Sequence, residues 1–576
     1  MSPSIPPPSN LVPFPGPTPG APERPRDGVI ELGIIELDQT TLFKQLHSDF
    51  KDDWFPDPRA FSDMIDSGLV ARKIQDNFAA NHGKYVPRAR DVFNIPKPNF
   101  TLRYGLETGL CDRVLYHGLT AYLVPLYDAL IPWNVFNHRY DHVRASHKSL
   151  FKRAVPAWKD FIGTVRSTLE EKAQTGAAFL LSTDISDYFD RIDLSQLRDT
   201  VLRLLPQVQA NANQKSQLRA RIDMLFDCLR YWSYQESRGL PQNRDASSFL
   251  ANVYMHPVDS ALLNNGYAGT YFRYMDDIKI ICSSEHRARR ALKQLSIALR
   301  EIGVSLNSKK TVICPAADKR ISEYLDEGSA DVQHIDEMWR SKSRHAIMRS
   351  FPFLKALTLR ICQDGRFDSK DFRFCINRLS SLALCPDFGV PDQYFDDLTP
   401  PILESLDRCP ASTDQLARYL LAAPVQPSDL DRVGSFLCDR EKCFYGWQNY
   451  HLWSLLARKK HRDVKLIERA VEIIQNEDDG PTRAGASLYI GTLGDPVSKR
   501  QLVDRFSSVK TFIGQRCAII AMHEVPYATI RESVQPQMRD DLVGVYRALQ
   551  GTRGVYYSPP ERIPLTELVD LDSQYD

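Results

Sequence analysis

Two adjacent aspartates, Asp276 and Asp277, lie within a mainly apolar stretch, TYFRYMDDIKIIC, between Thr270 and Cys282. The residues on either side are largely aromatic or β-branched, a composition typical of a buried β-hairpin. Burying an unpaired carboxylate costs several kcal/mol. The fold must therefore place this pair where a cation, a proton or solvent compensates for the charge.

A second group of aspartates, in TDISDYFDRID, follows the apolar run AAFLLST. If that run is a central strand, Asp184 lies at its C-terminal end, where it can meet Asp276 at the tip of the neighbouring hairpin. Oxygen ligands without His or Cys suit Mg²⁺ or Mn²⁺. Two such ions about 4 Å apart can activate a hydroxyl and stabilise a leaving pyrophosphate. The pattern predicts a metal site; a surface turn with two solvated aspartates is the alternative.

The order of the predicted elements divides the 576-residue chain into four parts. Residues 1–27 are rich in proline, which predicts a disordered tail. Residues 28–175 read as mainly helical, with an extended, proline-interrupted piece that ends at Tyr104. Residues 176–326 alternate strands and helices, which predicts an α+β, palm-like region. Residues 327–576 read as helical only.

The segments RAGASLYIGTLGD and RCAIIAMHEVP begin 33 residues apart, at Arg483 and Arg516. This period is typical of two-helix solenoid repeats, so we expect a HEAT-like array, with an irregular helical bundle as the alternative. Aromatic residues from Tyr445 to Trp453, next to the basic run at 456–462, suit single-strand binding, with helix packing as the favoured alternative.

The net charge of +1 hides two basic regions. Residues 84–166 hold 13 Lys and Arg against 6 Asp and Glu, and residues 285–320 hold 9 against 3. These regions can follow a phosphate backbone or form solvated helix faces. No CxxC pair, no signal peptide and no apolar run of about 18 residues occurs, so we expect a cytoplasmic protein with reduced thiols and no membrane span.

Several motifs resemble the reverse transcriptases. FRYMDD is similar to their catalytic Tyr-x-Asp-Asp box, and DISDYFD resembles their first palm motif. GLPQNRDASSFLAN is similar to their Gly-Leu-Pro-Gln turn, and GVSLNSKKT resembles the motif that follows the catalytic box. CDRVLYHGL and VFNHR resemble fingers segments. The resemblance covers about residues 90–320 and implies a right-hand polymerase, with fingers in 28–175 and the palm in 176–326.

The resemblance also implies roles for individual residues. Asp184, Asp276 and Asp277, with the backbone carbonyl of Ile185, would hold Mg²⁺ or Mn²⁺. Lys310 would be the general acid for pyrophosphate, with Lys309 as a rival. The expected nucleotide-binding residues are Asp187, Tyr188, Phe189, Gln242, Arg113 and Arg139. Among them, Phe189 would be the steric gate that excludes a ribose 2′-hydroxyl.

Asn243 stands where reverse transcriptases commonly have glycine, which puts ordinary template handling in doubt. A long helical region directly after the palm is similar to bacterial abortive-infection and defence-associated reverse transcriptases. That resemblance implies antiphage defence, RNA-directed or template-independent synthesis of a DNA product from dNTPs, an RNA template or noncoding RNA as partner, and a homo-oligomer. The alternatives are a retron-like enzyme that copies a bound RNA, and a catalytically silent scaffold that binds nucleic acid.

Overall fold

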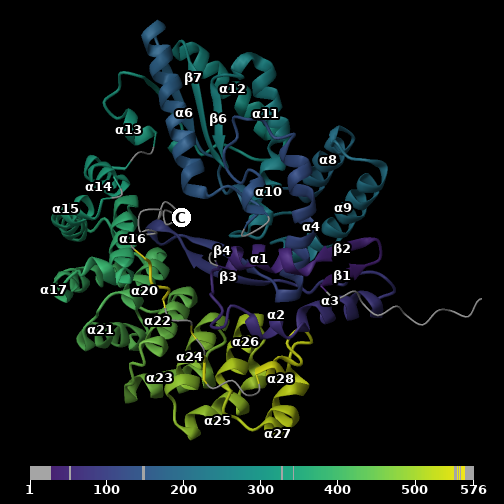
Figure 1. Cartoon of the computed structure of the whole chain (residues 1–576), viewed down its shortest axis with the longest axis vertical. Coiled ribbons are helices and arrows are strands. Elements are labelled where there is room, and N and C mark those ends of the chain that lie inside the picture. The colour runs from purple at the N-terminus through teal and green to yellow at the C-terminus, as the bar shows by residue number, and fades with distance from the viewer. Residues whose placement is uncertain are drawn as a thin grey trace, which may run out of the picture.

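The computed structural model describes residues 28–50, 53–145, 149–325, 328–341, 343–549, 554–555, 557 and 560–564. The predicted proline-rich tail lies outside the described residues. Figure 1 shows a palm at the top, an N-terminal region at the centre, and C-terminal helices that curve along the left side and beneath.

The palm is built on a four-stranded antiparallel sheet in the order β6-β7-β5-β8. The strands are β5 (Phe179–Thr183), β6 (Tyr271–Tyr274), β7 (Asp277–Cys282) and β8 (Val312–Pro315). Alternate residues face opposite layers. Leu180 and Ile281 pack with Phe161 of α6 (Ala154–Thr175), whereas Leu181 and Ile280 belong to the main core. Helix α12 (Glu285–Glu301), capped by the Ser284 hydroxyl, packs against β5, β7 and β8.

The palm helices largely follow the predicted spacing. They are α7 (Tyr188–Arg191), α8 (Leu194–Leu204), α9 (Ala212–Trp232), α10 (Asp245–Tyr254) and α11 (His256–Leu262). An Asn211–Gln214 capping box starts α9. Helix α10 follows the Gly-Leu-Pro-Gln turn and packs against α4 and α8.

The N-terminal region contains two β-hairpins, of which the first was not predicted. β1 (Val29–Leu32) pairs with β2 (Ile35–Asp38), and β3 (Asp91–Pro96) pairs with β4 (Leu102–Glu107). The helical spacing over 42–80 is divided among three helices, because the chain turns between them at Asp57–Phe61 and at Gly68. The helices of this region are α1 (Gln39–Asp49), α2 (Ser62–Asp66), α3 (Leu69–Ala80), α4 (Leu110–Asp128) and α5 (His142–Ala145).

From residue 328 onward, the described chain contains helices and no strand. The helices nearest the palm are α14 (Ala330–Arg340), α15 (Arg344–Gln363) and α16 (Lys370–Leu384), followed by the short α17 (Asp392–Asp396), α18 (Thr399–Ile402) and α19 (Ser405–Arg408). The later helices are α20 (Thr413–Ala422), α21 (Pro427–Cys438), α22 (Gly446–Arg458), α23 (Val464–Asn476), α24 (Gly480–Leu493), α25 (Pro496–Asp504), α26 (Phe512–Ala521), α27 (Tyr527–Thr529) and α28 (Val545–Leu549).

The later helices form two layers, as expected for HEAT-like pairs. Helices α22, α24 and α26 pack in sequence as an inner layer, and α21, α23 and α25 follow them outside. Glycines allow the helices of the inner layer to approach one another closely. A Cβ on Gly485 would lie 2.9 Å from Cβ of Trp453, and one on Gly491 would lie 2.6 Å from Cα of Ala521. The small residues that revealed the period are therefore the contact surface between successive repeats.

The inner layer also contacts the N-terminal region. The Trp447 indole donates to the carbonyl of Trp54 at 3.0 Å, and the Tyr450 hydroxyl donates to that of Pro56 at 2.5 Å. Together with Trp453, these aromatic side chains are buried. Of the two hypotheses for the 445–453 aromatics, helix packing therefore holds for these three. No helix in the described part of the chain is both long and apolar enough to cross a membrane.

Candidate active site

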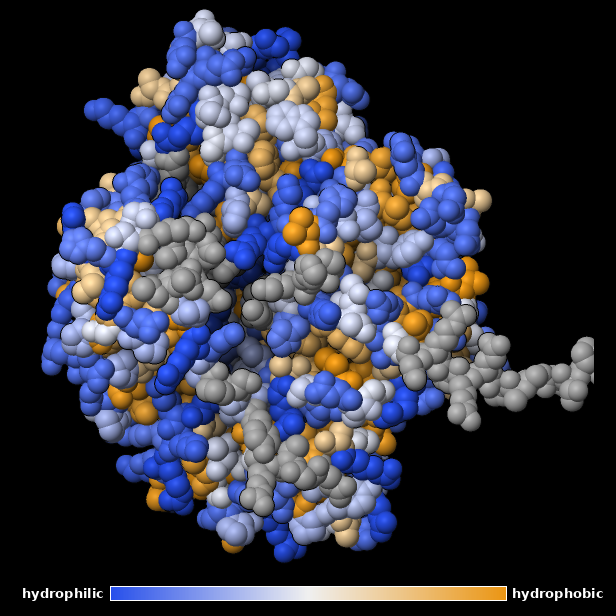
Figure 2. All heavy atoms as spheres, in the orientation of Figure 1, coloured by the Kyte–Doolittle hydropathy of each residue, from blue (hydrophilic) through white to orange (hydrophobic). Residues whose placement is uncertain are grey.

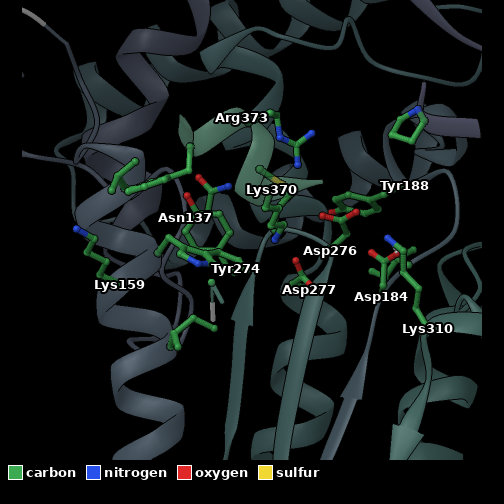
Figure 3. A pocket seen from close by; sticks show the side chains of 18 of the residues that line it. Asn137, Lys159, Asp184, Tyr188, Tyr274, Asp276, Asp277, Lys310, Lys370 and Arg373 are labelled. Carbon is green, nitrogen blue, oxygen red and sulfur yellow. Dashed lines mark ion pairs between the residues drawn. The ribbon is translucent and has the colours of Figure 1, made fainter. Parts of the chain in front are cut away.

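The two aspartate segments meet at one end of the palm sheet. Tyr274 pairs with Asp277, so Met275 and Asp276 form a two-residue hairpin turn. Met275 has a φ of 53°, as such turns require at their first position. Asp184 follows β5, the strand beside β7, and reaches the same edge. Figure 3 shows the three carboxylates around one end of a pocket.

A buried arginine fixes this turn. Arg273 donates to the Met275 carbonyl at 3.0 Å and to Asn252 at 2.9 Å, and it forms an ion pair with Asp259 at 2.7 Å. Tyr271 donates to the same aspartate at 2.5 Å. Because Arg273 and Asp259 are fully buried, the network holds the hairpin tip in one conformation.

The carboxylates are mutually repulsive. Burial, together with Asp184 and Asp277, raises the pKa of Asp276 to about 8. Burial also raises the pKa of Asp277, against the attraction of Lys279, whose amine lies 3.9 Å away. Lys279 is itself buried and donates to Ser182 at 2.7 Å. Sequence reasoning missed this lysine, although period-two alternation places it on the same face of β7 as Asp277.

Lys310 supplies a cation at the other side of the cluster. Its amine lies 2.8 Å from Asp184, and this contact raises the pKa of the amine against the effect of burial. Lys309, the rival from the sequence, does not line the pocket. Of the two lysines, the structure brings only Lys310 to the aspartates.

The donor set fits a hard divalent cation. Asp184, Asp276 and Asp277 offer oxygens only, and Mg²⁺ and Mn²⁺ prefer such ligands. Among the described residues, no group of three or more His, Cys, Asp and Glu side chains is already gathered around one point at metal-binding distances. A cation would relieve the repulsion that raises the pKa of Asp276. Ile185 also lines the pocket, and it bridges to Leu306.

The two neighbouring aromatic residues at the start of α7 have different surroundings. Phe189 is partly buried and lines the pocket. Tyr188 touches the pocket edge, but its buried hydroxyl donates to the Ala251 carbonyl at 2.6 Å. Gln242 lines the pocket too, and its amide donates to Asp190 at 2.5 Å.

Besides Met275, two residues at the pocket have left-handed backbone angles. Asp187 has a φ of 46°, and its carboxylate lies 3.7 Å from the amine of Lys97. Asn243 has a φ of 59°, a conformation that glycine adopts easily and asparagine tolerates better than most residues. Asn243 therefore adopts the turn conformation that glycine would adopt at this position. Its side chain occupies space that a glycine would leave empty.

The structure contradicts the phosphate-binding roles expected for Arg113 and Arg139. Arg113 is buried and lies 2.7 Å from Asp49 and 2.6 Å from Asp53. Arg139 donates to Asp128 at 2.8 Å and to several backbone carbonyls. Neither side chain lines the pocket. Both guanidinium groups form ion pairs with acidic side chains of the protein itself, and these contacts stabilise the fold.

The pocket has a volume of 1380 Å³ and lies between the palm, the β3–β4 hairpin and the C-terminal helices. Figure 2 shows mainly hydrophilic atoms in the hollow on this side of the molecule. The lining includes cations that the sequence analysis did not select, namely Lys97, Arg103, Lys159, Arg166, Arg340, Lys370 and Arg373. The last three come from α14 and α16, and no sequence motif marks them.

Residues 135–336 match the family model described as reverse transcriptase (RNA-dependent DNA polymerase). This stretch contains the whole palm sheet and every aspartate of the cluster. The chain therefore carries a reverse transcriptase domain. The domain is that of a nucleotidyltransferase of the RNA-directed DNA polymerase type, and the expectation of an enzyme is confirmed. Curated protein sequences give no match.

Solved telomerase structures resemble the chain weakly. Apo telomerase from Candida tropicalis truncated from its C-terminal domain is 13% identical, with a TM-score of 0.28; the match covers 46% of this chain and 56% of that one. Apo telomerase from Candida tropicalis is 11% identical over 84% of this chain and 74% of that one, with a TM-score of 0.30. The Candida tropicalis telomerase in complex with the TWJ fragment of telomeric RNA is 11% identical over 84% and 68%, with a TM-score of 0.31.

Proposed function

We propose that this chain is a DNA polymerase of the reverse transcriptase type that adds dNTPs to a growing strand and acts in bacterial antiphage defence. The observation that carries the chemistry is the meeting of Asp184, Asp276 and Asp277 at the rim of the palm, between Phe189 and Lys310. The defence role rests on the long helical region that follows the palm, which is similar to that of defence-associated reverse transcriptases.

The residues divide the work as follows. Asp184, Asp276 and Asp277, with the carbonyl of Ile185, would hold Mg²⁺ or Mn²⁺. When bound, the metal pair supplies activation of the attacking hydroxyl and stabilisation of the leaving pyrophosphate. Lys310 holds a proton 2.8 Å from Asp184, where it can pass to the leaving group.

The substrate is oriented by the pocket walls. Phe189 lines the pocket, where its ring would exclude a ribose 2′-hydroxyl, and Gln242 and Asp187, also in the lining, would contact the nucleotide. The fixed positions of these side chains favour a deoxynucleotide by shape. An RNA template or a noncoding RNA, and assembly as a homo-oligomer, belong to the same proposal.

Incorporation of labelled dNTPs by the purified protein tests the chemistry. With Mg²⁺ present, we expect the wild type to form DNA products and the Asp276→Ala/Asp277→Ala variant to form none. The variant should remain folded, because removing these two carboxylates relieves their repulsion with Asp184. Undiminished synthesis by the variant would refute the site. Phage plating on bacteria that express either form tests the defence role, where protection should require both aspartates.

The silent-scaffold alternative makes the opposite prediction. A scaffold would bind nucleic acid without incorporating dNTPs, and the double substitution would leave phage protection unchanged. Sequencing the copurified nucleic acid separates the remaining alternatives. One abundant small RNA favours a retron-like enzyme that copies a bound template, whereas random or homopolymeric DNA favours template-independent synthesis.

A further inference from the structure

The C-terminal helices contribute directly to the catalytic pocket. Helix α16 places Lys370 and Arg373, one turn apart, in its lining, opposite the palm aspartates. Figure 3 shows Lys370 extending from this helix towards the loop that carries Asp276 and Asp277. These cations follow the palm aspartates by more than ninety positions of sequence, so only the folding back of the helical region brings them there.

The two cations lie at a different side of the aspartates from the expected nucleotide. Figure 3 places Asp184 and Lys310 on one side of Asp276, and Lys370 and Tyr274 on the other. The expected steric gate, Phe189, and Asp187, which pairs with Lys97, follow Asp184 by five and three residues and line the same pocket. The side occupied by Lys370 is therefore the side from which a strand end would approach.

Aromatic rings accompany the cations on that side. The amine of Lys370 lies 5.3 Å from the ring centre of Trp158, which meets Tyr274 edge-on at 4.9 Å. Both rings are partly exposed. A cation beside accessible aromatic rings is the combination that binds single-stranded nucleic acid, by phosphate contact and base stacking.

The carboxylates nearby do not remove the need for an anionic ligand. Arg340 forms an ion pair with Asp336 at 2.7 Å, so that part of the wall is neutralised internally. Once metal neutralises the three palm aspartates, the pocket lining still holds eight Lys and Arg side chains against five Asp and Glu, and is therefore positive as a whole. A phosphate backbone supplies the matching negative charge.

We propose that Lys370 and Arg373 of α16, with Trp158 of the palm, bind the last nucleotides of the growing strand and present its 3′ end to the aspartates. The C-terminal helical region thereby performs in cis the task of a strand-holding domain. This inference rests on the proposed polymerase function and adds the residues that hold the strand.

Fluorescence anisotropy with a short, labelled single-stranded DNA that has a free 3′-hydroxyl tests the proposal. The assay contains the full-length protein and Mg²⁺ but no dNTPs, so that no synthesis occurs. We expect Lys370→Gln and Arg373→Gln each to weaken strand binding about tenfold. Each should also reduce the slope of log affinity against log salt by about 0.7. The Michaelis constant for dNTPs at saturating strand should stay unchanged.

Arg366→Gln is the matched control, because this exposed arginine lies four residues before Lys370, in the loop that leads into α16, and does not line the pocket. Unchanged strand affinity and salt slope in both α16 variants, with unchanged unfolding midpoints, would overturn the proposal. A raised Michaelis constant for dNTPs with unchanged strand affinity would overturn it too, because the cations would then contact the triphosphate. A wild type that binds the strand through these residues but incorporates nothing would support this inference and refute the proposed function.

Discussion

The guanidinium of Arg516 on α26 and the carboxylate of Asp63 on α2 are buried against each other, with nitrogen–oxygen distances of 2.5 and 2.7 Å. Asp57 completes the site at 2.8 Å from the same guanidinium. The two acids precede the palm and the arginine lies near the end of the helical array. This cluster therefore joins the N-terminal region to the C-terminal helical region.

Replacing the arginine should release this contact. Arg516→Met removes the cation from buried Asp57 and leaves buried Asp63 with Arg59 alone, at 3.4 Å, so we expect the free energy of unfolding to fall by about 3–5 kcal/mol. Chemical denaturation followed by circular dichroism measures the change. Adding Asp57→Asn and Asp63→Asn to Arg516→Met should restore part of the loss, since the buried carboxylate charges are then gone. Arg500→Met, at an exposed position of α25, is the control and should change stability little.

Sugar selection should depend on Phe189 and not on its neighbour. Phe189→Ala opens the pocket wall, so the preference for dNTPs over NTPs should fall by about 100-fold, while dNTP incorporation continues at a lower rate. Competition between labelled dNTPs and NTPs measures the ratio. Tyr188→Phe is the matched control: it removes only the hydroxyl that binds the Ala251 carbonyl and should leave selection intact. An unchanged ratio in Phe189→Ala would make this ring a simple packing residue.

The two adjacent lysines should behave differently. Lys310→Ala removes the amine next to Asp184, and loss of a general acid lowers kcat by about 100-fold or more. Lys309→Ala, outside the pocket, should keep kcat near the wild-type value. Lys310→Arg separates charge from proton transfer, because arginine keeps the charge but is a poor acid. Full rescue by arginine would show that Lys310 acts by charge alone.

The aspartate cluster could be predicted because its signal is local. The apolar run before Asp184 and the hairpin around Asp276 each encode a strand, and adjacent antiparallel strands bring their ends together. The roles expected for Arg113 and Arg139 came instead from the resemblance of their segments to fingers motifs. That resemblance gave no sign of the acids that pair with them, such as Asp49, which lies 64 residues before Arg113 and meets it only in the folded chain.

The wall of the pocket formed by α16 could not be predicted. Lys370 is one cation on one amphipathic helix, and nothing near it in sequence marks a site. Its position depends on how α16 packs against α15 and α20, which no local pattern in the sequence specifies. The period of the array was visible in the sequence, whereas the direction in which it curves was not.

The last prediction concerns Asp112, a buried carboxyl on α4. Burial raises its pKa to about 7, in spite of hydrogen bonds from the Tyr85 hydroxyl at 2.9 Å and the Arg88 amide at 3.2 Å. A carboxyl with a raised pKa binds its proton more tightly in the folded state. Its contribution to stability is therefore complete below the unfolded pKa of about 4 and is lost as the pH rises through about 7.

Asp112→Asn should remove this pH dependence, because the amide stays neutral while it can still accept a hydrogen bond from Tyr85. Denaturation at a series of pH values gives the free energy of unfolding for wild type and variant. The difference between them should shift in favour of the variant by up to about 4 kcal/mol between pH 4 and pH 8. Other titrating groups contribute equally to both proteins and cancel. Asp227→Asn, an exposed carboxyl on α9, is the control and should leave the pH dependence unchanged. Parallel curves for wild type and Asp112→Asn would show that Asp112 is ionised throughout this range.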